Sequence, residues 1–136
     1  MVIMEIQNVF TEAEEINVYN EGVKVTYSSE NDNYKKILEC WNNTIENSYQ
    51  MPAFGVSINN YTVEEMKHGL WVEFCFGKQI ERSQMPFEKL LVNVNKNYYG
   101  FNVIRYTSQR GYDGRCYYLD LNGNNMDNFY DFLSKL

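Results

Sequence analysis

Alternating hydrophobic and polar positions predict a β-hairpin near the start of the chain. Residues 16–19 and 23–27 alternate on either side of Asn20-Glu21-Gly22, and an Asn/Gly turn between two alternating segments is typical of a hairpin. Side chains along a strand point alternately to its two faces. We therefore expect Val23, Val25 and Tyr27 to face the core.

A second group of strands is predicted in the later half of the chain. Leu70, Val72, Phe74 and Phe76 share one side of an alternating segment, and three further segments are rich in β-branched and aromatic residues. The four predicted strands are 70–76, 90–95, 98–106 and 115–121. A polar stretch from Gly77 to Pro86 separates the first two strands, and Gly111 to Gly114 has the composition of a turn between the last two. This order predicts a four-strand antiparallel meander.

Apolar spacings of three and four residues predict two main helices and one short helix. The clearest helix begins at a cap, Ser29 or alternatively Asn31, has an apolar face from Tyr34 through Trp41 to Tyr49, and ends at Pro52. A capping-box pattern opens a helix of about two turns at Thr62, which ends at Gly69. A terminal helix follows Asn124 or Asn125, with its apolar face formed by Met126, Phe129, Leu133 and Leu136.

Together these elements predict one α+β domain over residues 1–136. We expect an antiparallel sheet of about five to seven strands, built from the N-terminal hairpin and the meander, with the two main helices packed on one face. Residues 2–7 are a further edge-strand candidate, and residues 53–58 are a candidate for a short strand.

Composition indicates the kind of organism and the cellular compartment in which the protein is expected. The formal net charge is −6, and the chain holds 18 Asn and 12 Tyr but only 4 Arg. Asn and Tyr have AT-rich codons, so we interpret the bias as that of a bacterial or phage genome. The three widely spaced cysteines favour reduced thiols, and neither a membrane span nor a signal peptide is found. We expect a cytoplasmic protein that binds neither membrane nor nucleic acid, because nucleic-acid binding needs positive charge.

Catalytic chemistry is weakly represented in the sequence. His68 is the only histidine, and a nucleophile with a basic partner is found only by pairing it with Cys75 or Cys116. Glu64 lies four residues before His68, but no further metal ligand has suitable spacing. Phosphate-loop and dinucleotide-binding motifs are missing. We expect no metal and no cofactor, and the absence of these motifs favours a protein without enzymatic activity.

Arginine is concentrated in one predicted hairpin. A turn centred near Arg110 would place Arg105 opposite Arg115, and like charges in directly opposite positions are destabilising. An anion should then lie nearby. It is either an internal carboxylate, with Glu73, Glu88, Asp113 and Asp120 as the candidates, or an external carboxylate or phosphate group held by the two arginines. A register shifted by one residue would put the arginines on opposite faces.

The same region is rich in tyrosine and asparagine, and two helices can cover only one face of the sheet. The other face would then expose tyrosine and arginine, residues that are common in protein-recognition surfaces. The alternative is that loops or the N-terminal hairpin cover this face. The candidate binding residues are Tyr99, Arg105, Tyr106, Tyr112, Arg115 and Tyr117.

Three functions remain open at this point. The first is a small acidic, non-catalytic binding module that engages a protein, as an inhibitor or immunity protein does, through the Tyr/Arg-rich face. The second is a protein or enzyme that binds a small anion through Arg105 and Arg115. The third is a homo-oligomer that buries the aromatic face against a second copy.

Overall fold

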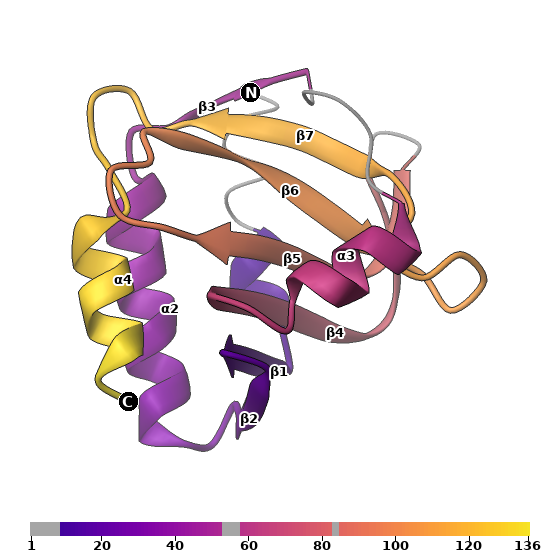
Figure 1. Cartoon of the computed structure of the whole chain (residues 1–136), viewed down its shortest axis with the longest axis horizontal. Coiled ribbons are helices and arrows are strands. Elements are labelled where there is room, and N and C mark those ends of the chain that lie inside the picture. Colours follow the sequence, from indigo (N-terminus) through magenta and orange to yellow (C-terminus); the bar gives the residue numbers. More distant parts are fainter. Residues whose placement is uncertain (1–8, 53–57, 83–84) are drawn as a thin grey trace.

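The computed structural model describes residues 9–52, 58–82 and 85–136. Within them lie seven strands, three α-helices and one 3₁₀ turn (Figure 1). The strands are β1 (Glu15–Asn20), β2 (Val23–Ser28), β3 (Tyr49–Met51), β4 (Leu70–Arg82), β5 (Met85–Val94), β6 (Gly100–Tyr106) and β7 (Arg115–Asp120). The helices are α2 (Asp32–Ile45), α3 (Asn59–Glu65) and α4 (Asp127–Ser134), and the 3₁₀ turn η1 is Phe10–Glu12.

All seven strands belong to one antiparallel sheet with the order β2-β1-β4-β5-β6-β7-β3. The β4–β7 meander forms its centre, and the β1–β2 hairpin joins it along β4. The predicted α+β class with an antiparallel sheet is therefore confirmed. Because β2 and β3 lie at opposite edges, the chain between them must cross the sheet, and α2 makes this crossing.

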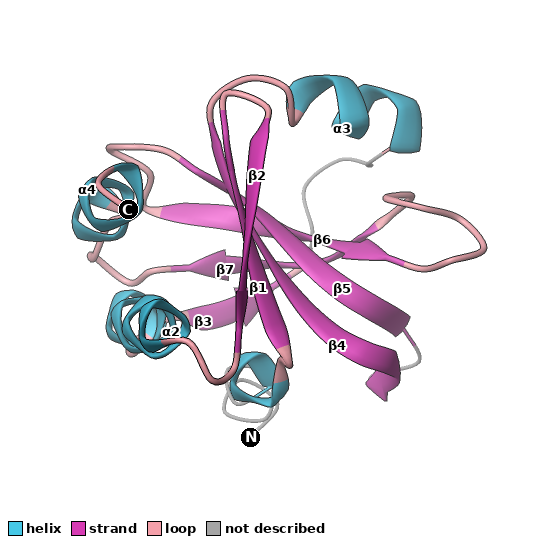
Figure 2. Ribbon diagram, turned by 90° about the horizontal axis from the view of Figure 1, so that it is seen from below, coloured by secondary structure: helices cyan, strands magenta, loops and turns pink. Residues whose placement is uncertain are grey.

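The two main helices pack on the same face of the sheet, and the short helix lies on the other (Figure 2). α2 and α4 pack side by side and contribute Ile37, Trp41 and Phe129 to the main core. α3 instead lies over a second, smaller cluster that includes Met66 and Trp71. We call these two sides of the sheet the helix face and the α3 face.

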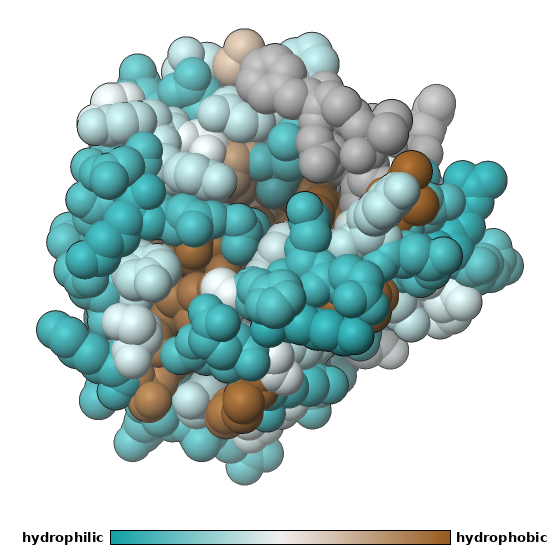
Figure 3. Space-filling view, in the orientation of Figure 1, coloured by the Kyte–Doolittle hydropathy of each residue, from teal (hydrophilic) through white to brown (hydrophobic). Residues whose placement is uncertain are grey.

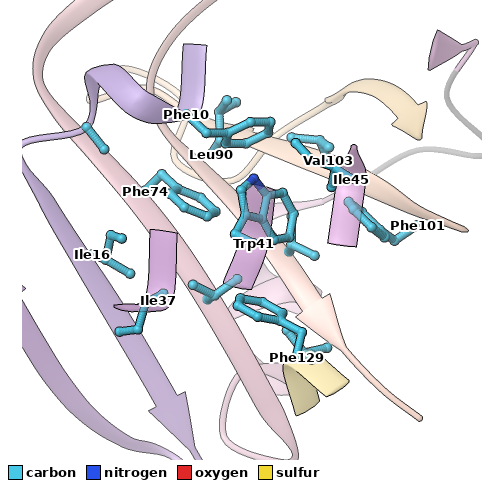
Figure 4. Packing of buried hydrophobic residues seen from close by; sticks show 14 of the residues in the cluster. Phe10, Ile16, Ile37, Trp41, Ile45, Phe74, Leu90, Phe101, Val103 and Phe129 are labelled. Atoms are coloured by element: carbon cyan, nitrogen blue, oxygen red, sulfur yellow. The ribbon is translucent and has the colours of Figure 1, made fainter. Parts of the chain in front are cut away.

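Trp41 occupies the middle of the main core (Figure 4). Its ring is 5.0 Å from the rings of Phe10 and Phe74, and 5.4 Å from those of Phe101 and Phe129, measured between centroids. Tilted and edge-on contacts of this kind add to the stabilisation from apolar burial. One aromatic side chain thus joins η1, α2, α4 and the sheet.

The helix boundaries differ from those predicted. α2 is capped by Asn31, whose Oδ1 accepts a hydrogen bond from the Asn33 N–H at 2.7 Å, so the alternative cap is the correct one. The helix ends at Ile45 rather than at Pro52, because residues 49–51 pair with β7 as β3. α3 begins at Asn59 and not at Thr62. The candidate strands at 2–7 and 53–58 fall outside the described residues, apart from Ile58.

The strand predictions need two further corrections. Residues 77–82 and 85–86 belong to β4 and β5, which pair again from Ile80 onwards after an irregularity in register that follows Cys75, and do not form a polar break. The predicted hairpin is present, but Val23 and Val25 are 65% and 45% exposed. They stand on an edge strand, and of its three apolar residues only Tyr27 packs partly against the core.

Candidate functional site

The α3 face carries polar and aromatic side chains on every central strand. They stand at positions that alternate with those of the main core, which is why the apolar pattern of the strands did not reveal them. The outward positions include Asn17 and Tyr19 on β1, Glu73 and Cys75 on β4, Lys89 and Asn93 on β5, Asn102 and Tyr106 on β6, and Tyr118 on β7. This face forms the candidate functional site.

A buried carboxylate lies at the centre of the face. Glu73 has no exposed surface, and it faces Asn17 directly across the β1–β4 pair. One of its oxygens accepts hydrogen bonds from Asn17 Nδ2 at 2.9 Å and from the Tyr19 hydroxyl at 3.0 Å. The other oxygen accepts a hydrogen bond from the Tyr112 hydroxyl. Three donors thus satisfy a group whose burial would otherwise be strongly unfavourable.

The same network holds the 107–112 loop on the sheet. Tyr112 comes from this loop and is buried, and its ring stacks near that of Tyr106 with the centroids 4.9 Å apart. Its backbone N–H donates to Asn59 Oδ1 at 2.9 Å, which connects the loop to the first residue of α3. Gly111 has a φ of 66°, and an added Cβ there would meet the Asn59 side chain. Tyr112 therefore connects the 107–112 loop both to β4, through Glu73, and to α3, through Asn59.

The electrostatics of this network follow from burial and from the Glu73 charge. Burial, followed by repulsion from Glu73, raises the pKa of Tyr112 and of Tyr19 well above 10.0. The same two causes raise the pKa of Cys75 to about 12. The hydroxyls and the thiol therefore keep their protons at neutral pH, and Cys75 is not an activated nucleophile.

Beside the network lies a small apolar platform. Met66, Trp71, Leu91, Ile104 and Tyr112 pack together, and Tyr19 and Tyr106 partly cover their rim. Trp71 is only 5% exposed, and its indole N–H donates to the His68 carbonyl at 2.9 Å. The α3 face is thus partly covered by α3 and the 107–112 loop, and is not a wholly open surface. The sequence left open whether this face is exposed or covered by loops or the N-terminal hairpin; in its central part, a loop covers it.

A hollow of about 240 Å³ lies between the end of α3 and the meander. Four tyrosine or asparagine residues are among those that line it: Asn93, Tyr98, Asn102 and Tyr118. Tyr118 lies across Gly100, and a Cβ added there would meet the tyrosine ring and hydroxyl, so a larger residue would have to displace this side chain. We call this depression, with Glu65 at its rim, the asparagine–tyrosine hollow. A shallower hollow continues from it past Asn93 towards His68.

Figure 3 shows this side of the molecule, where hydrophilic side chains cover most of the surface and apolar atoms show through in small areas between them. The residues at the outer end of α3 are an exception. Ile58, Tyr61 and Val63 are 48%, 71% and 40% exposed. The α3 face therefore carries both a polar hollow, at the end of α3, and exposed aromatic and aliphatic groups at the start and middle of that helix.

A second hollow, of about 270 Å³, lies near the other end of β4. Its charged lining mixes Lys24 and Lys89 with Glu14, Glu15 and Glu88. Glu88 is already engaged, because its two oxygens accept hydrogen bonds from the Ser108 N–H and hydroxyl at 2.8 and 2.7 Å, and these bonds lower its pKa. The charges of this hollow largely compensate one another and do not favour a ligand of either sign.

The predicted pairing of two arginines is wrong. The β6–β7 register places Ile104, and not Arg105, opposite Arg115, because the register shifts by one residue after Val103. This one-residue shift removes the geometric basis for an anion held between two opposed guanidinium groups. Arg105 instead lies against Gly114 and donates from Nη1 to the Pro86 carbonyl at 3.4 Å.

The other predicted binding residues are distributed over both sides of the sheet. Tyr99 is exposed in the turn before β6, and Tyr106 and Tyr112 belong to the α3 face. Tyr117 is buried in the main core on the helix face, opposite to the surface on which it was expected. The Arg115 side chain is not among the described ones. Whether these residues bind a partner stays a prediction.

The catalytic candidates are not brought together. His68 is exposed just before β4, whereas Cys75 is buried five residues into that strand, about 16 Å from its start at a rise of 3.3 Å per residue. Glu64 pairs with Lys67 at 2.9 Å rather than with His68. The Cys116 side chain is not described. Over the part of the chain that the structure describes, no three His, Cys, Asp or Glu side chains gather as metal ligands, and no helix has the length and apolarity to cross a membrane.

Sequence reasoning missed the role of Glu73, although it named this residue as an internal anion. The available signal was an acidic residue between Val72 and Phe74, in the middle of a strongly apolar strand. A charge at such a position is rarely buried without partners. Comparison with known proteins finds no matching family model, no matching curated protein and no matching solved structure.

Proposed function

We propose that this protein is a non-catalytic binding module whose α3 face docks a protein partner over the asparagine–tyrosine hollow. The observation that carries the proposal is that α3, whose last residue Glu65 lines the hollow, also exposes apolar side chains. Ile58, just before α3, and Tyr61 and Val63 within it are large hydrophobic residues that are exposed to solvent. Exposed aromatic and aliphatic groups beside a concave polar area are typical of recognition surfaces.

The chemistry of the hollow supports a protein as the ligand. Tyrosine offers a large contact area at a small cost in conformational entropy, and asparagine both donates and accepts hydrogen bonds. Tyr98, which lines the hollow, and its neighbour Tyr99 are 43% and 58% exposed, while Tyr61 is exposed on α3. Aromatic anchors on either side of a polar depression suit a partner loop or helix end that inserts between them.

The rigidity of the surrounding structure supports the same proposal. α3 is short and would not be stable alone, but Asn59 binds the 107–112 loop and Tyr112 binds Glu73. A surface that is held in place before binding loses less entropy when a partner docks. We assign the buried polar network this supporting role.

Charge sets the expected class of partner. The chain has a net charge of −6, and Glu65 lies at the rim of the hollow. A partner with a basic surface would be attracted at long range and would associate faster at low ionic strength. This property matches the inhibitor- or immunity-like role expected from the sequence.

Affinity capture from a lysate of the source organism, using matched variants, tests the proposal. Val63→Arg places a bulky charge on the α3 surface, and Val23→Arg makes the same change on β2, on the opposite face of the sheet from the hollow. We expect a protein captured in stoichiometric amount by the wild type and by Val23→Arg to be lost with Val63→Arg. The dissociation constant of the captured protein, measured by calorimetry, should be at least tenfold higher for Tyr61→Ala than for the wild type.

Two results would contradict the proposal. One is a captured protein that binds Val63→Arg and Tyr61→Ala as tightly as the wild type, because its site would then lie elsewhere. The other is catalytic turnover of a substrate by the wild type that the His68→Ala variant lacks, because the protein would then be an enzyme.

A further inference from the structure

In the described part of the chain, the outer side of β2 is an unpaired strand edge. β2 forms six residue pairs with β1 in an uninterrupted register, and it pairs with no other strand among the described residues. Its two valines, Val23 and Val25, are 65% and 45% exposed. They stand on the same side of the strand as Tyr27, which packs partly against the main core. An exposed apolar row therefore continues the core out to the edge of the sheet.

The two edges of the sheet differ in how open they are to pairing. Proteins protect their edges with very short strands, bulges, proline or inward-pointing charges. β3, at the opposite edge, has only three residues. β2 has six residues, no proline and no bulge, and Lys24 is its only charged residue. An edge of this kind is suited to the addition of another strand.

We propose that the β2 strands of two copies pair antiparallel about a two-fold axis through Val25, joining the two sheets into one. In this register Val25 faces Val25 of the second copy, and Val23 faces Tyr27 of the second copy. Lys24 then faces Thr26 of the second copy. All three apolar residues gain apolar partners on one side, and the polar residues meet on the other. The interface is isologous and closes at a dimer.

The alternatives to this register are less favourable. An axis through Lys24 would place two lysines directly opposite each other, which is destabilising. An axis through Thr26 would leave Val23 opposite Ser29 of the second copy. A register shifted by an odd number of residues would place the valines of one copy opposite polar residues of the other, such as Lys24 or Thr26. The apolar residues of the two copies would then lie on different faces of the joined sheet, because side chains alternate between faces. The sequence of β2 thus favours one register for self-pairing.

Charge also favours a second copy at this edge. Two chains that each carry −6 repel one another at most orientations. Acidic residues outnumber basic ones by 18 to 12 in the whole chain, but β2 bears no acidic side chain and one basic side chain, Lys24. The edge is therefore a place where two copies can approach without bringing carboxylates face to face along the strand.

The oligomeric state measured with matched variants tests the proposal. Sedimentation velocity of the full chain at a low and a high concentration should show a dimer of twice 16.2 kDa in the wild type. Val25→Lys should sediment as a monomer at both concentrations, because it puts two like charges on the axis. Val63→Lys makes the same change on α3 and should remain dimeric. A monomeric wild type, or a dimer that persists in Val25→Lys, would overturn the proposal.

Cross-linking tests the register itself. Opposite residues in an antiparallel pair have Cα atoms about 4.5 to 5.5 Å apart, within the range for a disulfide. Val25→Cys should therefore form a disulfide-linked dimer under mild oxidation. Lys24→Cys should not, because its Cα and that of its symmetry mate would be about 8 Å apart, given a two-residue offset along strands that rise about 3.4 Å per residue.

The wild type, with its own three cysteines, shows the background for this experiment. A Lys24→Cys dimer formed as readily as the Val25→Cys dimer would contradict the register. This interface is independent of the proposed function. Val25→Lys should still capture the protein partner, whereas Val63→Lys should lose the partner and keep the dimer, so the two proposals can fail separately.

Discussion

The two faces of the sheet bury their side chains in different ways. On the helix face, Trp41 packs among four aromatic rings, and the core is made mainly of aliphatic and aromatic side chains (Figure 4). On the α3 face, the central group is the carboxylate of Glu73, which three hydrogen-bond donors satisfy. The first face gains stability from area and packing. The second must keep its geometry, because a buried polar group without its partners is costly.

This difference indicates that the helix face mainly supplies stability, whereas the α3 face mainly fixes the positions of its groups. Packing on the helix face tolerates changes that conserve volume and apolarity. Hydrogen bonds on the α3 face specify one position for Tyr112, and through it the position of the 107–112 loop and α3. The face that supplies less apolar burial is thus the face that fixes the surface of the proposed binding site.

Truncation of Trp41 should have the largest effect on stability. Trp41→Ala removes a fully buried ring and leaves a cavity among aromatic neighbours, so we expect a loss of about 4 kcal/mol in the free energy of unfolding. Trp41→Phe should cost much less, because the indole N–H makes no hydrogen bond to the described residues and a smaller ring keeps several contacts. Chemical denaturation measures both. Equal losses would show that ring volume is not what matters here.

Removal of the buried carboxylate should come next. Glu73→Ala leaves Asn17, Tyr19 and Tyr112 without their acceptor, and at about 1 kcal/mol or more for each unsatisfied donor we expect a loss of about 3 kcal/mol. Glu73→Gln keeps one acceptor oxygen and should lose less. Denaturation together with hydrogen exchange of the 107–112 loop is the measurement. A stable Glu73→Ala protein with an unchanged loop would refute the supporting role of the network.

Tyr112→Phe should have a smaller effect that depends on pH. Loss of one hydrogen bond to a charged group should cost about 2 kcal/mol at neutral pH. The pKa of Tyr112 in the folded protein lies above its ordinary 10.0, so the unfolded chain releases this proton first as the pH rises. The stability contributed by the hydroxyl is therefore complete below pH 10 and falls above it, by up to about 1.4 kcal/mol per pH unit.

Denaturation curves between neutral pH and pH 11 check this prediction. The wild type should lose stability more steeply above pH 10 than Tyr112→Phe does. Tyr106→Phe is the matched control, because Tyr106 lies beside Tyr112 and its hydroxyl makes no hydrogen bond within the described part of the chain. Parallel curves for the wild type and Tyr112→Phe would contradict the assignment.

The smallest effect concerns reactivity and not stability. Burial and the Glu73 charge raise the pKa of the Cys75 thiol to about 12, so only a very small fraction is thiolate at pH 8. We expect labelling of Cys75 by a thiol reagent to be at least a hundredfold slower in the folded protein than in urea, as followed by mass spectrometry of the labelled peptide. Rapid labelling of Cys75 in the native state would show that the α3 face opens more readily than the static structure indicates.

The sequence predicted the elements of the helix face well. Its hairpin, meander and two main helices depend on local alternation and spacing, which are properties of neighbouring residues. The end of α2 was placed too late because residues 49–51 have a partner in β7, about seventy residues further along the chain. The exposure of Val23 and Val25 was also missed, since it depends on where the helices end and not on the pattern of β2.

The candidate site was only partly predictable. The sequence indicated a second face rich in tyrosine and asparagine, and such a face is present. It also placed Tyr117 on that face and set Arg105 opposite Arg115, and a one-residue shift in the β6–β7 register after Val103 accounts for the failed arginine pairing. Register at a bulge depends on contacts across the sheet, and a single residue changes the face on which a side chain lies.

By itself, the sequence determined the class of fold, the apolar side of β4 and β5 and the charge of the molecule, because each of these follows from residue types and their local spacing. The tertiary structure decided the rest. It brought Asn17, Glu73 and Tyr112, which are separated by more than fifty and by almost forty residues, into one hydrogen-bonded group. It also left β2 at an open edge and α3 beside the asparagine–tyrosine hollow. These features are contacts between distant segments, and local patterns carry no information about which distant segments will meet.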